Sequence, residues 1–96
     1  MALLDLLGRR WALRLLWELR DGEALTFREL QARCGNVSSS VLNQRLRELR
    51  DAGVITQRPG GYLLTGDGEK LILAMAPMDA WANEWAGRLP AQVSDG

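Results

Sequence analysis

The chain has 96 residues, of which 47% are hydrophobic, and its twelve basic side chains balance twelve acidic ones. This length fits one small domain, and the apolar content excludes a wholly disordered chain. Histidine is absent, which removes the commonest general base and the commonest metal ligand, and no phosphate-binding glycine motif occurs. We therefore expect neither an enzyme nor a metal or cofactor site.

Cysteine content and apolar patterning predict where the protein acts. Cys34 is the single cysteine, which excludes an internal disulfide framework and is typical of a reducing compartment. No apolar run resembles a signal peptide or approaches a membrane span in length. We expect a cytoplasmic protein with no membrane partner.

The charges are unevenly distributed along the chain. Residues 1–58 carry ten arginines against seven acids, whereas residues 59–96 carry two basic side chains against five acids. The N-terminal part therefore has a modest basic excess, of the sign that favours nucleic-acid binding.

Two helices are predicted before the turn signal at Asp21-Gly22. Ala2 to Leu7 form a short apolar stretch that stops near Gly8. Arg9 to Arg20 carry Trp11 and several leucines at a helical period, which predicts a helix with one broad apolar side.

The next segment predicts a helix-turn-helix. Thr26 and Glu29 have the spacing of a capping box, in which each side chain accepts a hydrogen bond from the other residue's backbone N–H. A helix should follow from Phe27 to about Arg33 and end in the turn Cys34-Gly35-Asn36. Two short capped helices separated by such a turn form a helix-turn-helix.

The second of these helices, over residues 39–52, is the predicted DNA-recognition helix. Ser38 or Ser39 can cap its start, and Gly53 supplies a left-handed residue at its end. Leucines recur on one side at helical spacing, while the other side carries hydroxyl, amide and guanidinium groups of the kind that contact phosphates and base edges. For this pattern alone, an ordinary solvated helix face is the alternative. The residues expected at base edges are Ser40, Asn43, Gln44 and Arg47, and those expected at phosphates are Arg28, Ser39, Arg45 and Arg58.

A β-hairpin is predicted directly after this helix. Val54 to Arg58 and Tyr62 to Thr65 are rich in β-branched and apolar residues, and Pro59-Gly60-Gly61 between them predicts a turn. A hairpin behind a helix-turn-helix is the wing of a winged-helix domain. Arg58 would then lie at the wing tip, where it could enter a minor groove, contact a phosphate or remain solvated.

The last predicted element is a long helix over residues 66–89, followed by a frayed tail over residues 90–96. Large apolar residues recur along this helix at alternating spacings of three and four, which is typical of a seam that packs against another helix. One small domain has little interior for so many large side chains, so we expect a dimer interface here, with packing on the chain's own core as the alternative. Pro77 should bend the helix. The predicted interface residues are Leu3, Leu4, Leu71, Met75, Met78, Trp81, Ala82 and Trp85.

Over roughly Leu3 to Ala86, the chain resembles the HxlR-type winged-helix regulators of bacteria and archaea. The run VLNQRLREL at residues 41–49 is similar to the VL-x-QRL-x-EL pattern of that family, and LLGRRW at residues 6–11 and TFREL at residues 26–30 support the likeness. The resemblance implies a homodimeric transcriptional regulator that dimerises through its terminal helices and places one recognition helix per subunit in successive major grooves. The wing is shorter here than is usual in the family, and the N-terminal cysteine through which some members sense oxidants is absent.

The sequence thus predicts a mainly α-helical winged helix-turn-helix domain with a small β-hairpin over residues 1–89. The predicted function is sequence-specific binding of double-stranded DNA by a homodimeric, non-enzymatic transcriptional regulator. A winged-helix module that binds protein and never DNA is the alternative, favoured by the neutral charge, the short wing and the tryptophans of the last helix. A small-molecule effector could bind among Trp11, Trp17, Trp81 and Trp85, although core and interface packing explains these rings more simply.

Overall fold

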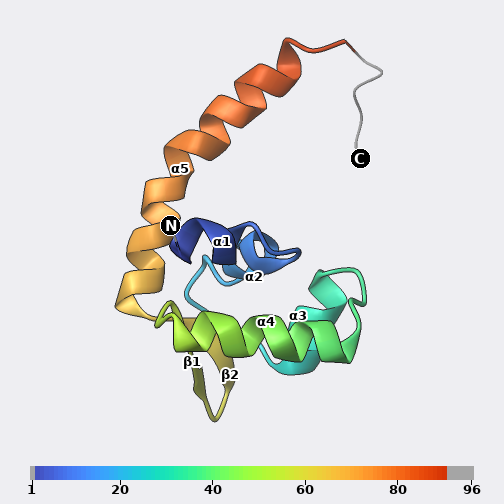
Figure 1. Cartoon of the computed structure of the whole chain (residues 1–96), viewed down its shortest axis with the longest axis vertical. Helices are drawn as coiled ribbons and strands as arrows, with labels where there is room; N and C mark the ends of the chain where they lie inside the picture. The colour runs from blue at the N-terminus through green and yellow to red at the C-terminus, as the bar shows by residue number, and fades with distance from the viewer. Residues whose placement is uncertain (1, 91–96) are drawn as a thin grey trace.

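The computed structural model describes residues 2–90, and the side chains of residues 4–90. It is mainly α-helical with one antiparallel hairpin, which confirms the predicted fold class (Figure 1). The predicted tail beyond Pro90 lies outside the described residues. Within residues 2–90, no helix is long and apolar enough to cross a membrane. The elements are α1 (Ala2–Leu7), α2 (Ala12–Glu18), α3 (Phe27–Arg33), α4 (Ser39–Asp51), β1 (Ile55–Arg58), β2 (Gly61–Leu64) and α5 (Gly66–Gly87).

The second helix is shorter than the sequence predicted. It begins at Ala12 and not at Arg9, because Trp11 adopts a left-handed backbone conformation with φ 76° and reverses the direction of the chain. Upstream, α1 closes with a hydrogen bond of 2.9 Å from the Gly8 N–H to the Leu4 carbonyl. Residues 8–11 therefore form a turn between α1 and α2, and the prediction of one helix from Arg9 to Arg20 was wrong.

The helix-turn-helix has the predicted caps. The Thr26 N–H donates to the Glu29 carboxylate at 2.8 Å, and the Glu29 N–H donates to the Thr26 hydroxyl at 3.1 Å, which confirms the capping box. The first of these bonds also lowers the pKa of the Glu29 carboxyl. At the start of α4 the Ser38 hydroxyl accepts from the Val41 N–H at 3.3 Å, and after its end Gly53 has φ 78°. The ends of α4 are therefore defined by these caps, as predicted.

The core lies between α2, α3, α4 and the hairpin. It consists mainly of leucines that are less than 3% exposed, and Cys34 lies among them at 1%. An ion-pair network braces α2 against α3: Arg14 donates to Glu18 at 2.8 Å and to the Arg33 carbonyl at 2.7 Å. Close packing and this brace fix the helix-turn-helix on α2.

The wing is a short hairpin that is held by backbone hydrogen bonds which its sequence did not predict. Ile55 pairs with Leu64 and Arg58 with Gly61, so Gly61 belongs to β2 and not to the turn. Leu25 forms an additional antiparallel bridge with Tyr62 through hydrogen bonds of 2.9 and 2.7 Å. Gly61, at φ 131°, has no room for a Cβ because the Leu25 backbone lies against it. The base of the wing is thus tied to the segment before α3.

The final helix starts on the body of the domain and then leaves it. Thr65 caps α5 by accepting from the Gly68 N–H at 3.1 Å and donates to the Gly53 carbonyl. Its first turns pack on the core through Leu71 and Ile72, whereas its C-terminal half projects away from the other helices (Figure 1). The helix continues through Pro77, and Figure 1 shows that its course bends along its length.

Candidate nucleic-acid interface

The outward face of α4 presents the predicted base-contacting residues. Leu42, Leu46 and Leu49 anchor the opposite face in the core, with 0%, 2% and 0% of their surface exposed. The outward-facing side chains are Ser40, Asn43, Gln44 and Arg47, all exposed. Within residues 4–90, none of these four side chains takes part in a hydrogen bond or an ion pair. Their donors and acceptors are therefore available to an external partner.

Two of the predicted phosphate-contacting residues already have partners in the chain. The Ser39 hydroxyl accepts from the Gln31 side chain at 3.2 Å. Arg45 folds back onto the domain, donating to the Arg10 carbonyl at 2.9 Å and to Glu48 at 3.2 Å, and only 14% of its side chain is exposed. Arg45 is therefore less accessible to a phosphate than the exposed Arg47, and its phosphate contact stays a prediction.

The other two predicted phosphate contacts lie on the elements that precede and follow α4 in the chain. Arg28 is exposed in the first turn of α3, and Arg58 is exposed at the end of β1, directly before the turn of the hairpin. The Arg50 guanidinium donates to the Gln57 side chain at 3.1 Å, which links the last turn of α4 to the wing. In Figure 1 the hairpin projects beside α4 on the side where α3 also lies. This bond helps to fix the orientation of the wing relative to α4.

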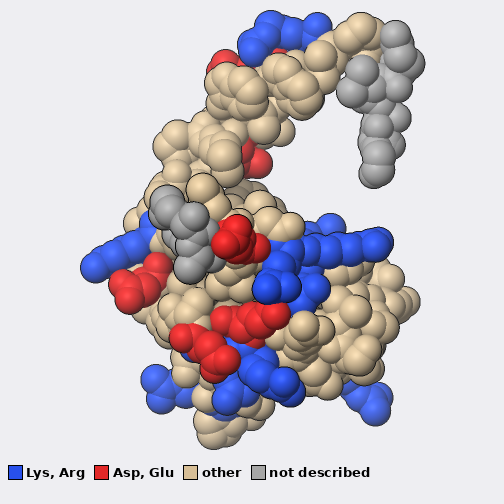
Figure 2. Space-filling model, in the orientation of Figure 1, with Lys and Arg blue, Asp and Glu red and all other residues tan. Residues whose placement is uncertain are grey.

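The charge over this part of the molecule is mixed. Figure 2 shows basic side chains along the lower edge, from which the wing projects, with acidic side chains above them on the front of the body. The projecting half of α5 is mostly uncharged in the same view. A second group of basic side chains lies on the right of the body in Figure 2, so the basic groups are not confined to the wing side and do not form a uniformly positive surface.

The predicted dimer residues divide into two groups. Leu71 is half-buried against the core of its own chain. Leu4 and three residues of the projecting half of α5 are exposed: Leu4 62%, Met78 57%, Trp81 57% and Trp85 44%. The rings of Trp81 and Trp85 stack at a centroid distance of 6.0 Å and an interplanar angle of 9°. The Leu3 side chain lies outside the described part of the chain.

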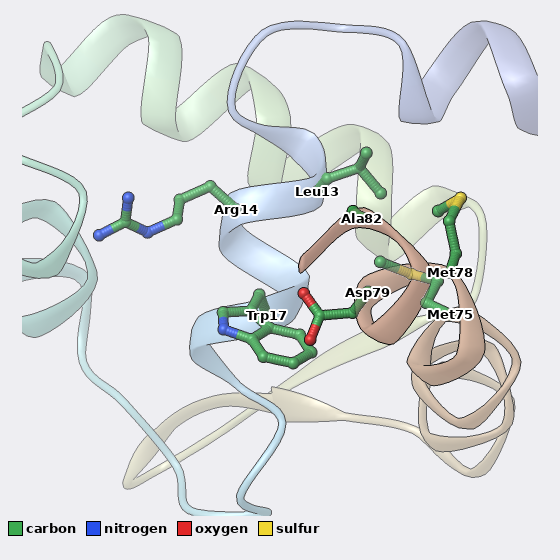
Figure 3. A pocket seen from close by; sticks show the side chains of 7 residues that line it. All are labelled: Leu13, Arg14, Trp17, Met75, Met78, Asp79 and Ala82. Carbon is green, nitrogen blue, oxygen red and sulfur yellow. The ribbon is translucent and has the colours of Figure 1, made fainter. Parts of the chain in front are cut away.

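A shallow hollow of about 320 Å³ lies where α5 leaves the body. Figure 3 shows Leu13 and Trp17 of α2 facing Met75, Met78 and Ala82 of α5 across it. The hollow is mostly apolar and open to the surface, and Arg14 and Asp79 are the charged residues that line it. Met75 and Ala82, both predicted interface residues, are half-buried and line this hollow.

Several residues that shape this interface gave no signal in the sequence. Trp11 sets the turn before α2, Gln31 holds the Ser39 hydroxyl, and Arg14 braces α3. Cys34 is buried, and burial raises the pKa of its thiol, so its position is that of a small core side chain. Among the described residues, no group of three or more His, Cys, Asp or Glu side chains could hold a metal ion.

Comparison with known proteins assigns the fold to a family. The family model described as HxlR-like helix-turn-helix matches residues 6–90. The chain belongs to this family. Both the resemblance inferred from the VLNQRLREL run and the winged-helix fold are thereby confirmed, and the family supports a DNA-binding transcriptional regulator.

Individual relatives agree with this assignment. The uncharacterized HTH-type transcriptional regulator YvaP of Bacillus subtilis (strain 168) is 33% identical over 88 residues, which cover 84% of this HxlR-like chain and 81% of YvaP. The crystal structure of quinone-bound YodB from B. subtilis superimposes with a TM-score of 0.78 at 28% identity and covers 86% of this chain and 92% of that one. A possible HxlR family transcriptional factor from Thermoplasma volcanium has the same fold, with a TM-score of 0.78 at 24% identity over 88% of this chain and 82% of its own.

Proposed function

We propose that this protein is a homodimeric transcriptional regulator that binds specific sequences in double-stranded DNA, with α4 in the major groove and the β1–β2 wing beside it. The observation that carries the proposal is the outward face of α4, whose four exposed polar side chains have no partner among the described residues although the helix itself is anchored in the core. No catalytic step is needed, because occupancy of an operator is enough to block or assist a polymerase. Its place of action is the cytoplasm of a prokaryote.

The chemistry of that face matches the pattern of hydrogen-bonding groups in the major groove. Asn43 and Gln44 can each pair bidentately with adenine, and Arg47 can pair with guanine. Each good pair of this kind contributes about 1–3 kcal/mol of discrimination against the wrong base. Arg28 and Arg58 are exposed cations on the elements that precede and follow α4 and fit phosphate contacts, which fix register without specifying sequence.

The proposed dimer forms through the terminal helices. The projecting half of α5 carries stacked, half-exposed tryptophans and has little of its own domain to pack against. Large aromatic side chains of this kind are typical anchors of protein interfaces. Two copies related by a twofold axis could bring their α4 helices about 34 Å apart, which is one turn of DNA and would select an inverted repeat. Binding of a small-molecule effector among the tryptophans stays a prediction.

Replacement of Gln44 tests whether α4 contacts bases. Gln44→Ala should weaken binding to an operator, selected from random duplexes by the wild-type protein, by about 5- to 150-fold for each subunit that contacts the DNA, which corresponds to about 1–3 kcal/mol per contact. Binding to unrelated DNA should change little, because that binding depends on phosphate contacts. Asn83→Ala removes an exposed amide from α5 and serves as the matched control, with both affinities unchanged. Equal losses on operator and unrelated DNA would contradict the role proposed for Gln44.

A winged-helix module that binds a protein is the second candidate, and the exposed tryptophans of α5 favour it. The two candidates predict different outcomes of the same selection. If the wild-type protein enriches no duplex and binds DNA only weakly at low salt, the protein-binding alternative is preferred.

A further inference from the structure

One mostly buried arginine attaches the recognition helix to the turn between α1 and α2. The Arg45 guanidinium donates from Nε to the Arg10 carbonyl at 2.9 Å and from Nη1 to the Glu48 carboxylate at 3.2 Å. The other oxygen of Glu48 lies 3.7 Å from the Arg9 guanidinium. Only 14% of the Arg45 side chain and 23% of the Glu48 side chain are exposed. Two elements far apart in the sequence are thus joined by a hydrogen bond from a charged donor, which is stronger than a neutral one, and by the Arg9–Glu48 ion pair.

The turn that Arg45 holds has an unfavourable backbone conformation. Trp11 has φ 76°, a value that bulky L-residues rarely adopt and that persists only where the surrounding structure imposes it. The Arg10 carbonyl belongs to the peptide unit directly before Trp11, so the bond from Arg45 fixes the orientation of that unit. The Arg10 guanidinium lies 5.6 Å from the centroid of the Trp11 ring and adds a second local contact.

The position of Arg45 on α4 connects this turn to the DNA-contacting face. Successive residues of an α-helix are about 100° apart, so Arg45 lies about 100° from Gln44 and about 200° from Arg47, on the side of α4 that faces the turn. A bond on that side resists rotation of α4 about its axis and movement along it. Bidentate contacts require side chains placed to within about 0.5 Å, so a small rotation of α4 would misplace Gln44 and Arg47 against the bases.

We propose that Arg45 is a positioning residue that sets the orientation of α4 on the domain and thereby the base contacts, and that it does not bind a phosphate. The inference rests on the proposed function, since positioning matters here only if α4 contacts bases. It assigns to Arg45 an effect on sequence discrimination, whereas a phosphate ligand would affect all DNA alike.

The test compares Arg45→Ala and Arg45→Lys with Arg58→Ala, which removes a proposed phosphate contact. Binding to the operator and to unrelated duplex is measured at several salt concentrations. Arg45→Ala should keep the wild-type salt dependence and the affinity for unrelated DNA, while its preference for the operator falls about tenfold. Arg45→Lys can still donate to the Arg10 carbonyl and should restore part of that preference. Arg58→Ala should instead lower the slope of log affinity against log salt by about 0.9 per subunit.

Two outcomes would overturn the inference. One is a loss of about 0.9 per subunit in the slope of Arg45→Ala, with equal weakening on both DNAs, because that result identifies a phosphate ligand. The other is an unchanged operator preference in Arg45→Ala.

Amide hydrogen exchange separates this inference from the proposed function. The Ala12 N–H donates to the Arg9 carbonyl at 3.2 Å within the turn, and the Leu30 N–H donates to the Thr26 carbonyl at 2.9 Å in α3. In Arg45→Ala, exchange at Ala12 should accelerate about tenfold relative to exchange at Leu30, because the turn loses its outside support. If the wild-type protein binds no DNA, the proposed function fails, and this ratio alone decides whether Arg45 holds the turn. An unchanged ratio would show that it does not.

Discussion

Gly68→Ala should destabilise the fold strongly, because α5 packs closely against the rest of the domain at this glycine. Gly68 is the only buried residue of α5, a helix that the structure describes in full. A Cβ at this position would collide with the Val54 carbonyl oxygen and lie 3.0 Å from its carbon. That carbonyl also accepts from the Thr65 N–H at 3.1 Å, so it cannot move aside without weakening the bond. The obstacle is therefore backbone that has little freedom to adjust.

The expected magnitude follows from these contacts. Overpacking costs about 1–3 kcal/mol, and a weakened hydrogen bond costs about 1 kcal/mol. We expect a loss of about 3 kcal/mol from a total of roughly 5–14 kcal/mol for a domain of this length. The melting temperature should then fall by about 12–24 °C.

Gly66→Ala is the matched control for this experiment. Gly66 lies two residues earlier in the same helix, and a Cβ there would meet nothing within 4 Å. This change should leave stability unchanged or raise it by about 0.4–1 kcal/mol, because alanine restricts the unfolded chain. Urea unfolding followed by circular dichroism, at equal protomer concentrations, measures both variants. Equal midpoints for the two variants would refute the reasoning.

Two further predictions concern the core cysteine and the exposed tryptophans. The Cys34 thiol is 1% exposed, and burial raises its pKa. Alkylation of Cys34 in the folded protein at pH 8 should therefore be about a hundredfold slower than in urea. A rate equal to that of the unfolded chain would contradict the placement of Cys34 in the core. Trp81→Ser should weaken dimerisation by about 30-fold while leaving the unfolding midpoint of the monomer nearly unchanged, because this side chain is 57% exposed within one chain. Sedimentation at several concentrations would show the change, and a wild-type dissociation constant in the variant would remove Trp81 from the interface.

Much of the fold was predictable because its signals are local. The capping box at Thr26, the N-cap at Ser38 and the left-handed Gly53 are each encoded within a few residues and were all confirmed. The features that could not be predicted depend on distant contacts. The left-handed Trp11 goes against its own conformational preference, and the Leu25–Tyr62 bridge joins segments that no sequence spacing relates.

In the candidate site, too, the features that could be predicted are local and the others depend on distant contacts. The helical period correctly separated the buried leucines of α4 from its exposed polar residues, since burial on one face follows from spacing alone. It could not show what each arginine contacts. Arg47 is exposed, whereas Arg45, two residues away, is bonded to the turn before α2. The choice between phosphate ligand and structural anchor depends on a carbonyl 35 residues away in the chain, for which the sequence carries no local signal.

Selection from a pool of random duplexes at two salt concentrations, with the mass of the protein in solution recorded alongside, tests the central claim most directly. The proposed function predicts that a dimer enriches an inverted repeat and that its affinity falls steeply as salt rises, because phosphate contacts release counterions. Failure to enrich any sequence, by a protein that is folded and binds DNA only weakly, would contradict it.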